Sequence, residues 1–174
     1  MASDSIEIVD ADADWPAQFA VERDRVAQML AGEPLLAIEH FGSTAIPGLA
    51  AKPIIDILVA VPSVVEARGR FPDLLRSDGY IFWADNPDTD RLFFVKGMPP
   101  FGEGRTHHLH VCERSGAMWD RLKFRDYLRA HPDEARRYAD LKRALAEKCG
   151  EDREAYTRGK DRFIARIMDL AETI

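Results

Sequence analysis

The sequence has few of the features that define several large classes of protein. It contains two cysteines, Cys112 and Cys149, and their wide separation predicts neither a disulfide framework nor a paired-cysteine zinc site. No apolar run approaches the roughly 20 residues of a membrane-spanning helix. The acidic start of the chain lacks the basic and apolar pattern of a signal peptide. Walker A, Gly-x-Gly-x-x-Gly and His-Glu-x-x-His motifs are missing too. These absences favour a cytoplasmic protein that does not enter a membrane.

The charged residues are unevenly distributed along the chain. The formal net charge of −6 argues against a protein that binds long nucleic acid nonspecifically. From Arg121 to Arg166, however, Lys and Arg outnumber Asp and Glu by 14 to 9, whereas the remainder has 10 against 21. This basic C-terminal third is either a set of solvated helix faces or a lining for a small anionic ligand.

Hydrophobic patterning predicts a single α+β domain over residues 1–174, with a sheet part at about 1–115 and a helical part at about 116–174. The expected strands cover 35–41, 54–61, 80–83, 91–96 and 106–111. The expected helices cover 15 to about 32, 63–77 with a break, 117–130, 132–148 and 152–172. The glycine- and proline-rich segment 97–104 predicts an antiparallel hairpin between the last two strands.

A Gly42-Ser43 pair closes one predicted strand, and Asp56 lies inside the next. Glycine lets the backbone approach an anion closely, and the serine hydroxyl is a donor. Asp56 is the only charged residue in the apolar run 54–61, where an ionised carboxylate is costly unless it is paired, hydrogen-bonded or metal-bound. This pattern favours a phosphate and metal site. The alternative is a structural aspartate bonded to loop amides.

Histidines are concentrated in the segment 106–111, which holds three of the five in the chain. Strand alternation places His108 and His110 on one face and His107 on the other. Two imidazoles at i and i+2 can bind a metal or hydrogen-bond to phosphate oxygens. The plainer interpretation is two polar residues on a wet face of the hairpin.

Cationic residues interrupt the apolar stripes of the predicted C-terminal helices. Lys142, Lys160 and Arg125 each lie at helical spacing from apolar neighbours. Such cations either extend aliphatic stems along the edge of a core or line an anion pocket. Lys52, before the Asp56 strand, and Arg91, at the start of another, are expected to add to the same positive lining.

The stretch HFGSTAIPGLAAKPIIDI at 40–57 closely resembles the GrpB family, as do THHLHV at 106–111 and FRDYL at 124–128. The resemblance covers nearly the whole chain. GrpB proteins are regarded as members of the nucleotidyltransferase superfamily, and in some bacteria a similar domain is fused behind dephospho-CoA kinase. The resemblance therefore implies a nucleotidyltransferase-like mixed sheet with packed helices and a C-terminal three-helix segment.

In that superfamily a Gly-Ser pair precedes a strand with two acids at i and i+2, and a later strand carries a third acid. These acids hold metal ions that orient a nucleoside triphosphate. Carried over, Gly42 and Ser43 match the phosphate-binding pair and Asp56 the first acid. The second acid falls on Leu58, which cannot bind a metal, and the nearest candidates for the third are the histidines at 108 and 110.

The resemblance thus implies one of two functions for a nucleotide or other phosphorylated small molecule. The first is a divergent nucleotidyltransferase in which Asp56 and Ser43 are catalytic. Asp56, His108 and His110 would then hold Mg²⁺, Mn²⁺ or Zn²⁺, and histidine ligands favour the last two. The phosphate contacts would come from Gly42, Ser43, Lys52, Arg91, Arg125, Lys142 and Lys160. The second is a non-catalytic sensor or accessory domain that binds a nucleotide or a CoA-like anion.

Overall fold

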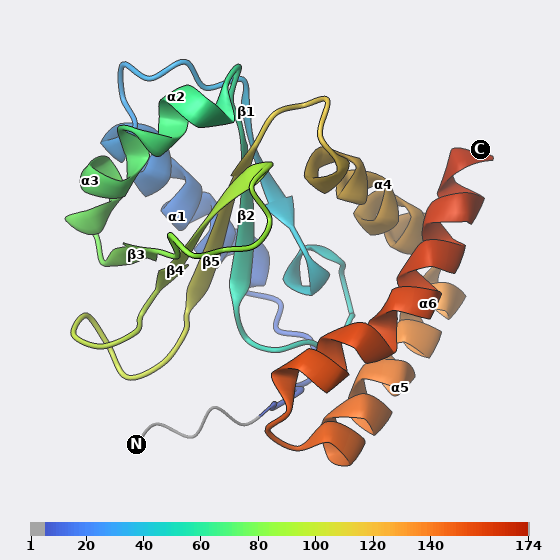
Figure 1. Cartoon of the computed structure of the whole chain (residues 1–174). Coiled ribbons are helices and arrows are strands. Elements are labelled where there is room, and N and C mark those ends of the chain that lie inside the picture. Colours follow the sequence, from blue (N-terminus) through green and yellow to red (C-terminus); the bar gives the residue numbers. More distant parts are fainter. Residues whose placement is uncertain (1–5, 174) are drawn as a thin grey trace.

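The structure is a computed structural model that describes residues 6–173, so most of the acidic N-terminal segment lies outside the described part. Five strands form one mixed sheet in the order β1-β2-β5-β4-β3 (Figure 1). Only the central pair, β2 and β5, is parallel, and the other neighbours are antiparallel. The strands are β1 (Ala37–Phe41), β2 (Ile55–Ala60), β3 (Tyr80–Phe82), β4 (Arg91–Lys96) and β5 (His107–Cys112).

Three N-terminal helices cover one face of the sheet. They are α1 (Trp15–Met29), α2 (Val64–Arg68) and α3 (Phe71–Arg76). The residues of β2 that face them, Ile55, Ile57 and Val59, are almost completely buried in the main hydrophobic core. This is the face that strand alternation predicts for them. The break expected within 63–77 is also present, between α2 and α3.

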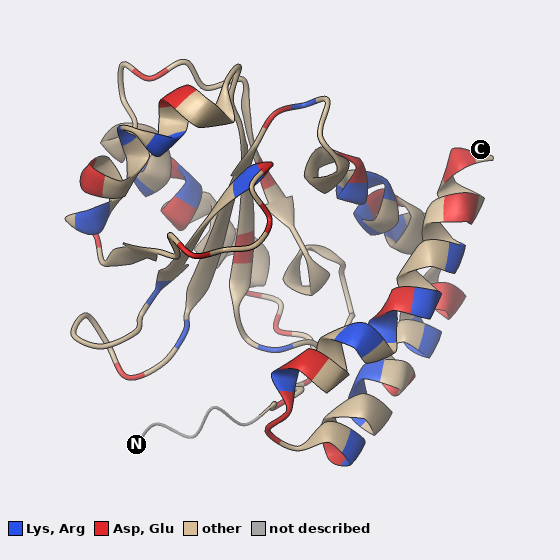
Figure 2. Ribbon diagram, in the orientation of Figure 1, with Lys and Arg blue, Asp and Glu red and all other residues tan. Residues whose placement is uncertain are grey.

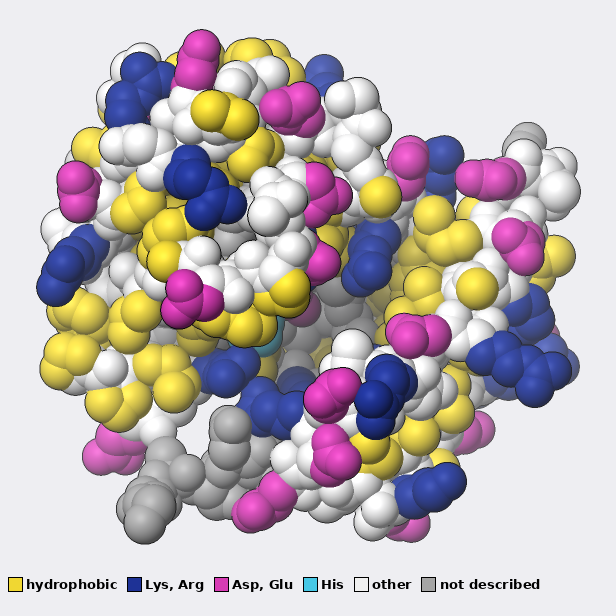
Figure 3. Space-filling view, viewed as in Figure 1, with side chains coloured by type: hydrophobic (Ala, Val, Ile, Leu, Met, Phe, Trp, Pro, Cys, Tyr) yellow, Lys and Arg dark blue, Asp and Glu magenta, His cyan; other side chains and the backbone are white. Residues whose placement is uncertain are grey.

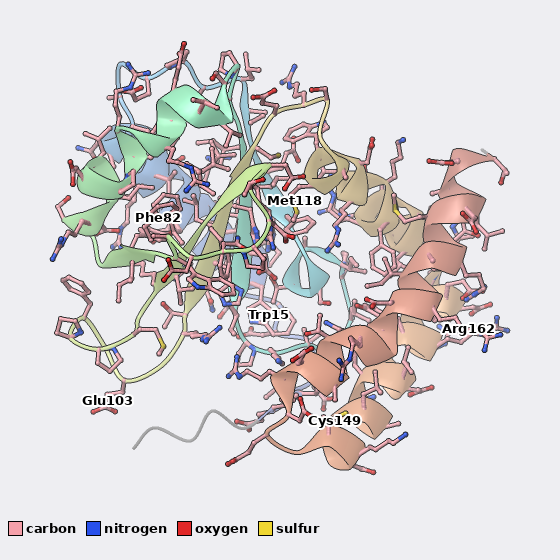
Figure 4. All side chains as sticks on the ribbon, viewed as in Figure 1. Trp15, Phe82, Glu103, Met118, Cys149 and Arg162 are labelled. Atoms are coloured by element: carbon pink, nitrogen blue, oxygen red, sulfur yellow. The ribbon has the colours of Figure 1, made fainter. Side chains whose placement is uncertain are left out.

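The C-terminal helices lie on the side of the other face (Figure 1). They are α4 (Ala117–Ala130), α5 (Pro132–Cys149) and α6 (Arg153–Glu172). Leu58 on β2 packs with Cys112 and with Met118, at the start of α4 (Figure 4). The rest of this sheet face, around Asp56, is not covered by α4 and instead faces the start of α6.

The connection between β1 and β2 joins the helical part to the sheet part. It contains the 3₁₀ turn η1 (Ser43–Ala45), followed by the buried residues Ile46 and Leu49, which pack in a second core with α4, α5 and α6. Within that core Tyr138 on α5 stacks on Phe163 of α6 at 5.0 Å. Lys and Arg residues recur along all three helices (Figure 2). The segment that carries the Gly-Ser motif is therefore held between the two parts.

The predicted elements correspond closely to the observed ones, and the predicted α+β class is confirmed. β4 has the predicted bounds, and β5 is displaced by one residue. β4 and β5 pair antiparallel, as the hairpin prediction requires. Within residues 6–173, no helix is both long enough and apolar enough to cross a bilayer.

Candidate functional site

A row of side chains runs across the sheet on the face that α4 leaves open. In the strand register, Asp56 on β2 lies beside His108 on β5, which lies beside Val95 on β4 and then Ile81 on β3. These four residues line a cleft of about 1040 Å³, with residues at the start of α6 on its opposite wall. Figure 3 shows the hollow between the sheet part and α6, with a histidine at its base and Lys or Arg side chains beside it.

Gly42 brings the turn after β1 against the carboxylate of Asp56. Its backbone has φ 70° and ψ −168°, a region that is populated almost only by glycine. A Cβ atom at this position would lie 2.9 Å from Cγ of Asp56 and closer still to Oδ2. Ser43 follows at the start of η1 and lines the cleft. The Gly-Ser pair and the acid are therefore in direct proximity, although Asp56 comes 13 positions after Ser43 in the chain.

Asp56 and His108 form a hydrogen-bonded pair at the base of the cleft. Nδ1 of His108 lies 3.1 Å from Oδ1 of Asp56. An ionised carboxylate can only accept, so the imidazole hydrogen is assigned to Nδ1. Nε2 of His108 is buried, and no described residue provides it with a partner. The side chains of Asp56, His108 and His110 form a candidate metal-ligand cluster, with one donor atom from each within 4.8 Å of the others.

His110 differs from His108 in its hydrogen-bond partner, which is an arginine and not a carboxylate. Nη1 of Arg91 lies 2.6 Å from Nδ1 of His110, and the same guanidinium binds the carboxylate of Asp88. Arginine only donates, so Nδ1 of His110 is an acceptor and the imidazole hydrogen lies on Nε2. Burial lowers the pKa of His110 well below its usual value, and the charge of Arg91 lowers it further. His110 is therefore neutral and has no free lone pair while Arg91 stays in place.

Lysines from three segments line the α5–α6 end of the cleft, at Lys52, Lys142 and Lys160. The ammonium groups of Lys52 and Lys160 lie 4.5 and 4.7 Å from the ring centre of Tyr156. Lys142 donates to the backbone carbonyl of Ala50. Burial, followed by the charge of Lys160, lowers the pKa of Lys142 to about 7. Burial also lowers the pKa of Lys160, against the opposing charge of Asp56. An anion in the cleft would favour the charged form of both.

Arg125, which the sequence places in the same positive lining, is held elsewhere. Its guanidinium donates to the carboxylate of Glu39 at 2.8 Å, to the carbonyl of His40 at 2.7 Å and to Asp126. These contacts attach α4 to β1, and Arg125 is not among the residues that line the cleft. Of the five predicted cations, Lys52, Arg91, Lys142 and Lys160 line the cleft and Arg125 does not.

Leu58 occupies the place at which the superfamily carries its second acid. Its side chain is completely buried and packs against Cys112 and Met118. An acid there would lie in an apolar layer beneath α4 instead of in the cleft. Leu58, where this chain differs from the superfamily pattern, is thus part of the hydrophobic core and not a substitution at a solvent-exposed position.

Sequence reasoning missed several residues of the cleft. Trp83 was expected only as the end of a strand, and Asn86 only as part of a turn, yet both line the cleft. Asn86 is buried, although the neighbouring residues 87–90 are exposed. Tyr156 also lines the cleft, and its only signal was the spacing of four residues that separates it from Lys160. Nothing in the pattern of a polar turn indicates that one of its residues points inward.

Comparison with known proteins adds family information to this geometry. The family model described as GrpB protein matches residues 5–170. A UPF0157 protein of Pseudomonas aeruginosa is 56% identical over 169 residues, which cover 97% of this chain and 68% of that protein. The crystal structure of the conserved protein GrpB from Enterococcus faecalis is similar with a TM-score of 0.82 at 33% identity, over 95% of this chain and 96% of that one.

A more distant relative carries an enzyme name. A dephospho-CoA kinase of Mycolicibacterium paratuberculosis is 28% identical over 178 residues, which cover 90% of this chain but only 43% of the kinase. Most of that kinase therefore lies outside the region of similarity.

Proposed function

The chain belongs to the GrpB family of the nucleotidyltransferase-like superfamily, and from this premise we propose that its cleft binds a nucleotide or similar phosphorylated ligand together with one divalent metal ion. The observation that carries the proposal is the Asp56–His108 pair, which lies against Gly42 in a cleft that three lysines line. The carboxylate and imidazole donors suit a metal ion, and the neighbouring cations suit a phosphate. Together they suit a phosphate that is bound to a metal ion better than they suit the metal or the phosphate alone.

The donors present fit a metal through Asp56 and His108. Two ligands at about 2.0–2.1 Å from a tetrahedral ion are ~3.3 Å apart, close to the 3.1 Å that separates Oδ1 from Nδ1. The ion would take the place of the hydrogen between these atoms, and the imidazole hydrogen would then lie on Nε2, which leaves the lone pair of Nδ1 for the metal. A bound ion would neutralise phosphate charge and polarise the phosphorus–oxygen bond. His110 can join these ligands only when Arg91 turns away from its Nδ1. A carboxylate with one or two imidazoles favours Mn²⁺ or Zn²⁺ over Mg²⁺.

The lysines and Arg91 supply the charge that phosphates require. The ammonium groups of Lys52 and Lys160 both lie near the ring of Tyr156, and Lys142 is buried. Binding a phosphate repays the desolvation of these ammonium groups, because the anion replaces the water that burial removed. Ser43 can donate its hydroxyl to the same anion. Arg125 takes no part, because its donors are used by Glu39, Asp126 and the carbonyl of His40.

Burial of Leu58 favours a second function, binding without catalysis. Two-metal nucleotidyl transfer needs acids on both sides of the ions, and here the second position belongs to the apolar layer under α4. On this alternative the cleft holds a nucleotide or CoA-like anion as a sensor or accessory domain. The name of the dephospho-CoA kinase relative, which refers to a CoA-like compound, is consistent with this alternative.

Titration calorimetry tests the proposal with nucleoside triphosphates in Mg²⁺, Mn²⁺ or Zn²⁺. We expect binding that requires a divalent metal, and a loss of at least tenfold in Asp56→Asn. The matched control Asp169→Asn changes an exposed acid on α6 and leaves binding unchanged. Lys160→Met weakens binding, whereas Lys148→Met, at an exposed lysine of α5, does not. Equal affinity of the wild type and Asp56→Asn would refute the site. Release of pyrophosphate in the same mixtures separates transfer from binding alone.

A further inference from the structure

The two ends of the cleft differ in chemistry. Lysines line the end beside α5 and α6, whereas apolar side chains line the end formed by β3 and β4: Ile81, Trp83, Phe93, Met98 and Pro99. Hydrophobic side chains gather on this side of the hollow in Figure 3. A ligand that consists only of phosphate would use one end and leave the other in water.

Trp83 is the most exposed aromatic side chain of this lining, with 48% of its surface accessible. Both its backbone and its ring contact Phe93 on β4. The backbone N–H donates to the carbonyl of Phe93 at 2.9 Å, and its ring meets the Phe93 ring edge-on at 5.9 Å. Phe93 in turn contacts the ring of His108 at 5.2 Å. An exposed indole that continues an aromatic row toward the metal-ligand cluster is a surface suited to stacking.

Asn86 lies beside Trp83 in the sequence and lines the same cleft. Its side chain is 8% exposed, and Oδ1 accepts a hydrogen bond from the backbone of Asp88 at 3.1 Å. Its Nδ2 has no hydrogen-bond partner in the part of the chain that the structure describes. A buried amide left without an acceptor costs about 1–3 kcal/mol. The nitrogen and oxygen acceptors on the edge of a heterocyclic base are partners of the right kind.

The sheet sets the distance between the two ends. Asp56, His108, Val95 and Ile81 occupy one row on β2, β5, β4 and β3. Three strand spacings place Ile81 roughly 14 Å from Asp56. A ligand that contacts both must therefore be extended, with its charged group and its ring at opposite ends.

We propose that the β3–β4 end is the subsite for the base of a nucleotide, which stacks on Trp83 while the phosphates lie near Asp56, Lys52 and Lys160. This inference rests on the proposed function and adds the substrate class and its orientation. Such a subsite would bind nucleotides in preference to phosphosugars and inorganic polyphosphate, because the last two classes have no planar ring that can stack on the indole.

The test compares each of the four ribonucleoside triphosphates with inorganic tripolyphosphate, on the full chain with Mn²⁺, by calorimetry and tryptophan fluorescence. We expect at least one nucleotide to bind wild type about tenfold or more tightly than tripolyphosphate and to quench fluorescence. Trp83→Ala should weaken the binding of that nucleotide about 5- to 150-fold, since a stacked base contributes that much, and leave the binding of tripolyphosphate unchanged. Trp83→Phe should retain most of the nucleotide affinity while losing the quenching. Phe101→Ala, at an exposed aromatic outside the cleft, should have no effect.

Two other outcomes separate the proposals. If tripolyphosphate binds as tightly as every nucleotide and Trp83→Ala alters none of them, the base subsite is refuted while the phosphate site stands. If neither class of ligand binds wild type, the proposed function fails and the subsite fails with it.

Discussion

Gly42→Ala perturbs the contact between the turn and the acid on which the site depends. The substitution adds a single methyl group. It forces an L-residue into φ 70°, ψ −168°, at a cost of about 1–3 kcal/mol. The new Cβ would also lie 2.9 Å from Cγ of Asp56, so the carboxylate has to move. Loss of its hydrogen bond to His108 adds about 1 kcal/mol.

The expected total is a decrease of roughly 2–4 kcal/mol in the free energy of unfolding, or about 4–16 °C in Tm for a chain of this size. Gly48→Ala is the matched control. Gly48 has φ 73°, but a Cβ there has no heavy atom within 4 Å, so it carries the backbone strain without the clash. Its expected cost is about 1–2 kcal/mol.

Calorimetric unfolding and Mn²⁺ titration together provide the assay. Both variants lose stability, but only Gly42→Ala loses Mn²⁺ and nucleotide affinity, because only there is the carboxylate displaced. If Gly42→Ala binds Mn²⁺ as the wild type does, or if Gly48→Ala loses binding to the same extent, the contact between Gly42 and Asp56 does not shape the site.

Three further predictions concern the cations around the cleft. In urea unfolding, the free energy of unfolding of the wild type minus that of Lys142→Met should rise by about 2–3 kcal/mol between pH 7 and pH 9. The folded protein, in which the pKa of Lys142 is lowered to about 7, has then released a proton that the unfolded chain still holds. A difference that does not change with pH contradicts the burial of Lys142 as the cause of its lowered pKa. Arg91→Met frees Nδ1 of His110 and should tighten Zn²⁺ binding several-fold in the absence of nucleotide, as a competitive chelator assay would detect; unchanged affinity excludes His110 as a ligand. Arg125→Met should lower the free energy of unfolding by about 1–3 kcal/mol and leave nucleotide affinity within twofold, whereas a large loss of affinity would return Arg125 to the site.

Local patterns account for most of what could be predicted from the sequence. The apolar run of β2 with a single charge identified both a central strand and the acid on its open face, because burial of a lone carboxylate is costly. Strand alternation placed His108 and His110 on one face of their strand, but it did not place His108 beside Asp56. That neighbourhood depends on β2 and β5 being adjacent and parallel, a long-range pairing that no local signal specifies.

The interpretation of the cations shows where local patterns are insufficient. Arg125, Lys142 and Lys160 all interrupt apolar stripes, and the sequence treats them alike. Their roles differ because of partners elsewhere in the chain: Glu39 lies 86 residues before Arg125, while Lys160 points into the cleft with Tyr156. Likewise, Arg91 and His110 meet only because β4 and β5 pair in a particular register. Side-chain periodicity identifies inward-facing cations, and only tertiary structure shows which of them are already paired.

The proposed function depends on Asp56 and His108, which we propose to hold a metal ion against a phosphorylated ligand. Anomalous diffraction at the manganese edge, from crystals grown with Mn²⁺ and a nucleoside triphosphate, tests it most directly. We predict one strong peak within coordination distance of Oδ1 of Asp56 and Nδ1 of His108, with phosphate density toward Lys52 and Lys160. Phosphate density elsewhere, or an ordered nucleotide in the cleft with no peak at this pair, would contradict it.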